Sequence, residues 1–154
     1  MISDTARYHG SFFSLLFDTA CESMEVKKLA DHGVGYYLLG GCVPVYLKHS
    51  TRRKGPWTFN FFRSHQEAQK TLFETYGECF TCMICGKDGV AGLSMDEFRQ
   101  VLDGNFEEQE CVSVRRRLKT MYQIKGRDGE LERRVGRRSV FEELIEAVKN
   151  ARQI

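Results

Sequence analysis

Residues 34–48 read VGYYLLGGCVPVYLK and hold two β-favouring runs, Val34–Leu39 and Cys42–Lys48. A Gly40-Gly41 pair separates the runs, and such a pair tolerates the positive φ angles of a tight two-residue turn. The stretch therefore predicts a β-hairpin. Pro44 has no N–H to give to a neighbouring strand, so we expect the second arm to be an edge strand or to have a locally interrupted ladder.

Helices are expected on both sides of this hairpin. Residues 11–23 place four apolar side chains at helical spacing: Phe13, Leu16, Phe17 and Ala20. This spacing predicts a helix whose apolar stripe is buried. Three later helices are indicated by a Ser-x-x-Glu pattern, in which the hydroxyl and the carboxylate each accept a bond from a free backbone N–H. These patterns begin at Ser64, Ser94 and Ser139.

Further strands follow from alternation and from turn signals. Trp57, Phe59 and Phe61 alternate along the chain and predict a strand with three aromatics on one side. Later β-favouring runs lie at 78–85, 90–93, 111–118, 120–125 and 130–135. Helices and strands do not alternate strictly enough for a doubly wound sheet. We therefore expect an α+β fold, a single domain over residues 1–154 with a mixed or mainly antiparallel sheet and about four helices.

The composition is that of one ordinary soluble domain. The chain has 154 residues, of which 42% are hydrophobic and 12% aromatic, enough to close one core and too apolar for disorder. No apolar run approaches the roughly 20 residues that span a bilayer, and Met1-Ile2-Ser3-Asp4 lacks the order of a secretory signal. We expect a cytoplasmic protein with no membrane partner and with its six cysteines reduced.

Cys79, Cys82 and Cys85 form a double C-x-x-C, a spacing that suggests zinc or an iron–sulfur cluster. In a strand, side chains alternate, so Cys79 and Cys85 would face one way, roughly 20 Å apart, and Cys82 the other. Three thiolates cannot converge on one ion from that arrangement. We expect buried structural thiols here, with no metal and no cofactor.

The net formal charge of +2 hides a strong segregation along the chain. Residues 48–63 hold five bases and no acid, residues 64–110 hold three bases and ten acids, and residues 115–138 hold ten bases and three acids. A basic face attracts phosphate backbones through counterion release, whereas acidic and basic segments that meet in the fold neutralise each other. The sequence leaves both interpretations open.

Residues 46–59, YLKHSTRRKGPWTF, lead from an apolar strand that ends in lysine through a basic loop to Pro-Trp and a second strand. A later run, CGKDG at 85–89, closes another predicted strand. Together these segments resemble a pattern in short bacterial and phage proteins of uncharacterised function. The resemblance spans about residues 34–103 and implies no activity.

The predicted α-β-β-β-α-β opening is similar to the core of the restriction-endonuclease-like superfamily. That resemblance implies a carboxylate-x-Lys motif that holds Mg²⁺ and positions water. Here Tyr46-Leu47-Lys48 supplies the lysine but has tyrosine in place of the carboxylate, and residues 34–63 contain no Asp or Glu. The missing carboxylates argue against a metal-dependent nuclease, which is retained as a third alternative.

The sequence favours a non-enzymatic protein that binds nucleic acid or a nucleoprotein complex through a basic loop and a basic β-meander. The loop offers phosphate-binding cations, and Trp57 is either a stacking plane for a base or part of the core. Arg115, Arg117 and Lys119 would share one face of a strand. The predicted nucleic-acid-binding residues are Lys48, Arg52, Arg53, Lys54, Trp57, Arg115, Arg117, Lys119, Arg133, Arg134, Arg137 and Arg138.

No catalytic residue is assigned, because the four histidines are scattered and no nucleophile or phosphate-loop motif is present. The alternative from a different class is a protein-interaction or inhibitor module, of the kind that phages use against bacterial defence. It would use the acidic stretch 64–110 or the face of the predicted C-terminal helix.

Overall fold

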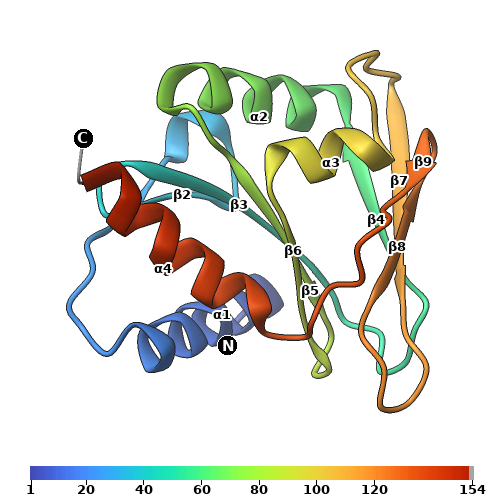
Figure 1. Cartoon of the computed structure of the whole chain (residues 1–154), viewed down its shortest axis with the longest axis horizontal. Coiled ribbons are helices and arrows are strands. Elements are labelled where there is room, and N and C mark those ends of the chain that lie inside the picture. The colour runs from blue at the N-terminus through green and yellow to red at the C-terminus, as the bar shows by residue number, and fades with distance from the viewer. Residues whose placement is uncertain (153–154) are drawn as a thin grey trace.

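Two β-sheets and four α-helices pack together in the part of the chain that the structure describes (Figure 1). The computed structural model describes residues 1–152. The first sheet has the strand order β1-β2-β3-β5-β6. Its strands are β1 (Val26–Lys28), β2 (Tyr36–Leu39), β3 (Val43–Ser50), β5 (Phe80–Cys85) and β6 (Gly89–Leu93). Because β3 and β5 run parallel and the other pairs antiparallel, this sheet is mixed.

The second sheet is antiparallel, with the order β4-β7-β8-β9. Its strands are β4 (Trp57–Phe62), β7 (Gln109–Arg115), β8 (Gln123–Gly126) and β9 (Gly129–Glu130). In β4 the side chains of Trp57, Phe59 and Phe61 are buried and the residue after each of them is exposed, which confirms the predicted alternation. The chain thus leaves the first sheet after β3, enters the second as β4 and returns as β5.

The first sheet is covered on both faces. Helices α1 (Asp4–Ala20) and α4 (Ser139–Arg152) bury Phe12, Leu16 and Leu144 against one face. Helices α2 (Arg63–Tyr76) and α3 (Met95–Val101), together with the second sheet, pack on the other face. A short 3-10 helix, Ala30–His32, precedes β2. The predicted α+β class is confirmed.

The predicted hairpin is confirmed: β2 pairs antiparallel with β3, and Gly40 and Gly41 have φ angles of 59° and 73°. The prediction that Pro44 marks an edge strand was wrong, because β3 lies between β2 and β5. The alternative, a locally interrupted ladder, is not seen either, because the pairing of β2 with β3 is continuous from the pair of Tyr36 and Tyr46 to the pair of Leu39 and Val43. Pro44 faces Leu38 of β2, whereas pairing with β5 begins only at Val45, so the missing N–H falls where no strand needs it.

The cysteine segment alternates as expected. Cys79, Met83 and Cys85 are buried toward the second sheet, and Cys82 is buried toward α1 and α4. Burial raises the pKa of the Cys79 thiol to about 12 and moves the pKa values of Cys82 and Cys85 in the same direction. These thiols are therefore structural and protonated at neutral pH.

Helix boundaries differ from the predictions in two places. Helix α1 begins at Asp4, capped by Ser3, so its buried face runs through His9, Phe12 and Leu16, and Phe17 is 46% exposed. Helix α2 begins one residue before Ser64, and the Phe62 N–H donates to His65 Nδ1 at 3.2 Å. None of the helices within residues 1–152 has the length and apolar character needed to cross a bilayer.

Candidate anion-binding surface

Three loops and the segment before α4 meet at one end of the molecule. The β3–β4 and β7–β8 loops leave neighbouring strands, because Trp57 at the start of β4 pairs with Val114 near the end of β7. The β5–β6 turn joins them through a hydrogen bond from the Gly86 N–H to the Ser50 carbonyl at 2.9 Å. The Val90 N–H donates to the Arg137 carbonyl at 2.8 Å, which attaches the last segment.

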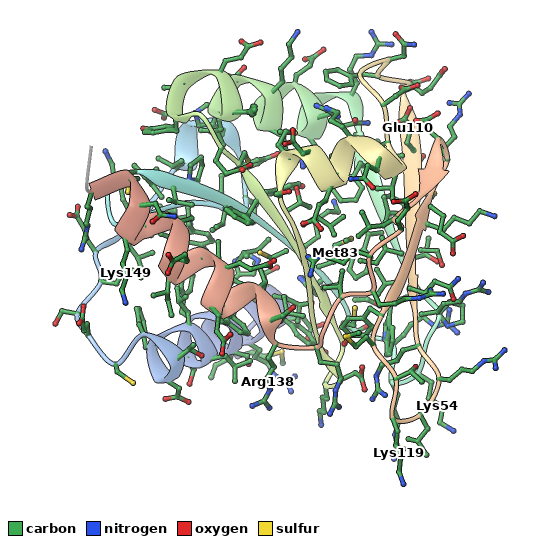
Figure 2. All side chains as sticks on the ribbon, in the orientation of Figure 1. Lys54, Met83, Glu110, Lys119, Arg138 and Lys149 are labelled. Carbon is green, nitrogen blue, oxygen red and sulfur yellow. The ribbon has the colours of Figure 1, made fainter. Side chains whose placement is uncertain are left out.

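The contact between the β5–β6 turn and the β3–β4 loop requires glycine at position 86. Its φ is +54°, and a Cβ there would collide with the carbonyl oxygen of Arg52 in the β3–β4 loop. The two loops therefore touch through their backbones. Figure 2 shows the result for the labelled side chains: Lys54, Lys119 and Arg138 project at this end, and Glu110 lies at the opposite one.

A concavity of about 740 Å³ opens beside the β7–β8 loop. Five basic residues line it, and no residue of its lining is acidic. They are Arg115, Arg116, Arg117, Lys119 and Arg134. Thr120 and Gln123 add a hydroxyl and an amide to the same wall. Guanidinium forks with neutral hydrogen-bonding neighbours match the oxygens of a phosphate group.

Asp88 in the β5–β6 turn anchors the base of this concavity. Its carboxylate accepts from Arg116 Nε at 2.7 Å and from the Tyr122 hydroxyl at 2.8 Å, and Arg137 Nη1 lies 3.8 Å away. The hydrogen bond from Arg116 holds the pKa of the Asp88 carboxyl below its usual range, and the Tyr122 bond acts in the same direction. Arg116 is therefore a structural cation, and the other four basic residues of the lining are free for a ligand.

The β7–β8 loop departs from the strand that was expected through Leu118. Strand β7 ends at Arg115, so Arg117 and Lys119 lie in the loop and do not share a strand face with Arg115. Arg117 and Thr120 close a turn, in which the Thr120 N–H donates to the Arg117 carbonyl at 3.1 Å. All three cations nevertheless line the same concavity, because the turn folds the loop back beside the strand end.

The β3–β4 loop supplies exposed cations next to this concavity. Arg52 Nη1 donates to the Pro56 carbonyl at 3.1 Å, which fixes the loop, and Arg53 and Lys54 are exposed. Trp57 is not available as a stacking plane. Its side chain is 3% exposed, and its indole N–H donates to the Arg52 carbonyl at 3.0 Å. The core interpretation of Trp57 is the correct one.

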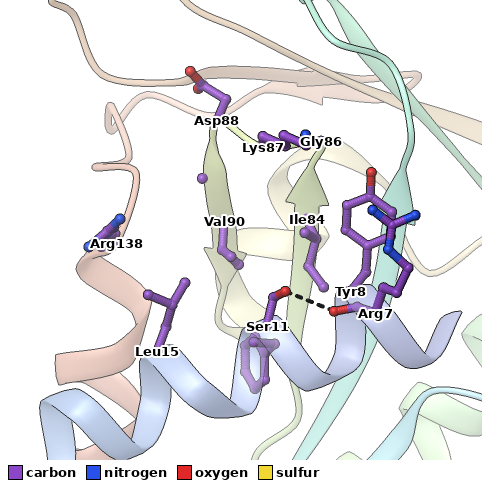
Figure 3. Close-up of a pocket in the computed structure, with 12 residues that line it drawn as sticks. Arg7, Tyr8, Ser11, Leu15, Ile84, Gly86, Lys87, Asp88, Val90 and Arg138 are labelled. Carbon is purple, nitrogen blue, oxygen red and sulfur yellow. Dashed lines mark hydrogen bonds between the residues drawn. The ribbon is translucent and has the colours of Figure 1, made fainter. Parts of the chain in front are cut away.

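Three further predicted residues lie apart from the concavity. Arg133 is paired with Glu97 at 2.7 Å and with Glu143 at 3.3 Å, so it connects α3 to α4. Arg137 lies close to Asp88. Arg138 lines a separate cleft of about 230 Å³ between α1 and the β5–β6 turn, with Arg7 and Lys87 (Figure 3). The sequence did not predict four further lining residues, because no local pattern marks them: Arg7, Lys87, Thr120 and Gln123.

Lys48 does not belong to this surface. Its ammonium group lies 3.3 Å from the Tyr46 hydroxyl and 3.4 Å from His65 Nδ1, beneath α2. Burial lowers the pKa of Lys48 to about 8, and burial and then Lys48 lower the pKa of His65 to about 4. No ion pair joins Lys48 to a carboxylate within residues 1–152.

Replacing Lys48 by methionine is expected to stabilise the protein at pH 7 by about 1 kcal/mol, because even a half-buried ammonium is costly without a charged partner. Between its folded pKa of about 8 and its ordinary value of 10.5, Lys48 binds more protons in the unfolded chain. The free energy of unfolding of the wild type should therefore rise with pH in this window, and that of Lys48→Met should rise less. Urea unfolding across the window tests this, with exposed Lys27→Met as the control, and equal pH profiles would contradict it.

Acidic side chains gather at the end opposite the loops. Asp103, Glu110 and Asp128 each place a carboxylate oxygen within 4.8 Å of the others. Protein donors already bind these groups: Gln66 Nε2 donates to Glu110 at 2.7 Å, and the Asp103 N–H donates to Asp128 at 2.9 Å. The cluster is accounted for as a structural network that ties α2 to the second sheet.

Comparisons with protein-family models, curated proteins and solved structures gave no significant match.

Proposed function

We propose that the protein binds nucleic acid through the phosphate backbone, at the end formed by the β3–β4 and β7–β8 loops. The observation that carries the proposal is the concavity lined by five basic residues and no acid. Arg116 is committed to Asp88, which leaves Arg115, Arg117, Lys119 and Arg134 for phosphates. Arg53 and Lys54 extend the same cationic surface from the neighbouring loop.

The distribution of charge supports the same orientation. Of the ten acids between residues 64 and 110, all but Asp88 and Glu110 lie on α2, on α3 and in the segments that follow these helices, and Glu110 lies near the start of β7. These helices lie at the end away from the loops (Figure 1). A polyanion is therefore attracted to one end and repelled from the other, which orients the encounter and raises the association rate.

The expected mode is recognition of phosphates without stacking on a base. The buried Trp57 offers no ring face, and no aromatic residue occurs between Arg115 and Met121. Phosphate contacts fix the position of a protein on a duplex but carry no base information. The protein should accordingly show little sequence preference.

Fluorescence anisotropy with a labelled duplex of about 20 bp tests the proposal. The four free cations of the concavity alone contribute about −3.6 to the slope of log affinity against log salt, at roughly 0.9 per phosphate neutralised, and Arg53 and Lys54 should make the slope steeper. Single-stranded DNA and RNA of the same length are measured alongside. No binding at about 50 mM salt, or an affinity that ignores salt, would remove the proposal.

The two alternative functions, a protein-interaction module and a metal-dependent nuclease, have less support than the binding of nucleic acid. The apolar face of α4 is buried on the first sheet through Val140, Phe141, Leu144 and Val148. A protein partner would therefore have to use the acidic end, and its capture would survive nuclease treatment. No described carboxylate accompanies Lys48, so no observation favours the nuclease alternative.

A further inference from the structure

The tip of the β7–β8 loop exposes two apolar side chains among its cations. Leu118 is 84% exposed and Met121 is 53% exposed. Arg117 and Lys119 flank Leu118 in sequence, and Met121 lines the basic concavity. At this exposure the Leu118 side chain makes little contact within its own fold, so its apolar surface is accessible to a partner.

The tip is ordered before any partner arrives. The Arg117 N–H donates to Thr120 Oγ1 at 3.1 Å, and the Thr120 hydroxyl donates back to the Arg117 carbonyl at 2.7 Å. Lys119 has a φ of 64°, an unfavourable conformation for a residue with a Cβ, which the turn imposes. Below the tip, Asp88 holds Arg116 and Tyr122. The loop thus presents Leu118 without a large entropic cost on binding.

The surroundings of Leu118 define the chemistry of the partner. An apolar tip ringed by cations fits a ligand whose charge is negative at the surface and whose interior is apolar. Duplex DNA has this construction, since stacked bases lie between two lines of phosphates. An anionic membrane shares the charge, but a surface anchor normally presents the broad apolar face of an amphipathic helix, and the exposed apolar residues of this tip are only Leu118 and Met121.

We propose that Leu118 is a wedge that enters between two adjacent base pairs of duplex DNA and kinks it toward the basic concavity. The proposal rests on the proposed function and adds the partner class and the distortion. Proteins that insert an apolar side chain between base steps lose stacking energy and gain phosphate contacts along the bent backbone. Here those contacts would be made by Arg115, Arg117 and Arg134.

Two readouts test the wedge, each comparing wild type with Leu118→Ala and with the control Val34→Ala, which truncates another exposed apolar residue. The first is energy transfer between dyes at the two ends of a duplex, which rises when the DNA bends. The second is the affinity for a duplex with one central mismatch, relative to a fully paired duplex. A mismatch lowers the cost of unstacking, so the wild type should bind the mismatched duplex about 5- to 10-fold more tightly.

Leu118→Ala should bind with an unchanged salt slope, produce little bending and lose the preference for the mismatch, and Val34→Ala should behave as the wild type. If Leu118→Ala bends DNA and prefers the mismatch as the wild type does, the wedge is refuted while the proposed function stands. If the wild type binds no nucleic acid, the proposed function fails and the wedge with it. Leu118-dependent binding to vesicles containing phosphatidylserine, without DNA bending, would overturn the wedge in favour of a membrane contact.

Discussion

Replacing Arg115, Arg117, Lys119 and Arg134 together by alanine is expected to weaken binding to duplex DNA by about 100-fold or more at roughly 100 mM salt. Each of these cations neutralises one phosphate, so their loss should also flatten the salt dependence by about 3.6 in slope, at roughly 0.9 per phosphate. All four side chains are exposed, so the variant should fold with nearly unchanged stability. Anisotropy titrations at several salt concentrations measure both effects.

The matched control removes four exposed bases elsewhere: Lys27, Lys28, Arg63 and Lys149. It changes the net charge of the protein by the same amount, so it separates the local surface from the overall charge. We expect it to weaken binding only a few-fold and to keep most of the salt slope. Equal losses of affinity in the two variants would show that the nucleic acid is held by net charge alone.

Replacing Asp88 by alanine is expected to lower the free energy of unfolding by about 3 kcal/mol, the cost of removing one partner of a largely buried ion pair. The side chains of Arg116 and Asp88 are only 12% and 18% exposed, so Arg116 would be left without its counter-charge. The Tyr122 hydroxyl would lose its acceptor. Urea unfolding measures the loss, with the exposed Glu132→Ala as a control that should be nearly neutral.

The same carboxylate predicts a dependence on pH. Its folded pKa lies below the unfolded value of about 3.9, so its contribution to stability is complete above that value and is lost as the pH falls through the folded pKa. The stability difference between wild type and Asp88→Asn should therefore be constant near neutral pH and shrink below about pH 4. A difference that stays constant down to pH 2 would contradict this role for Asp88.

Local patterns predicted the local structure well. The hairpin at Gly40-Gly41, the alternation of β4 and the opposed cysteines of β5 each depend on a few adjacent residues, and each is confirmed. The hairpin loop has three residues where the sequence predicted two, because Leu39 pairs with Val43. The Ser94 capping box is also present, with Glu97 accepting from the Ser94 N–H at 3.1 Å. The same pattern at Ser64 failed because His65, one turn into the helix, accepts the Phe62 N–H instead.

The division into two sheets could not be predicted in this way. Strands β4 and β7 are separated by two helices and two strands. No local periodicity in the sequence indicates that these two strands pair with each other. For the same reason the sequence did not predict that the strand of Pro44 lies between two others, because a missing N–H indicates an edge or an interrupted ladder but not which neighbouring strand would pair there.

The candidate site was predicted in part. The charge of the basic segments could be counted in the sequence, but which of their cations are free could not. The fold places four of them around the concavity: Arg115, Arg117, Lys119 and Arg134. Arg133 instead binds Glu97 and Glu143. Asp88 and Arg116 lie 28 residues apart, and nothing in the sequence links them. Lys48 and Trp57 were misplaced because the basic loop between them is exposed while the strands at its two ends are buried.

Chemical-shift mapping tests the central claim most directly. Titrating the isotope-labelled protein with a duplex should shift the backbone amides of residues 52–54, 115–121 and 134, and leave those of α2 and α3 unchanged. Shifts centred on the acidic end, or no shifts at any ratio of DNA to protein, would contradict the claim that the loops at one end of this molecule form its nucleic-acid interface.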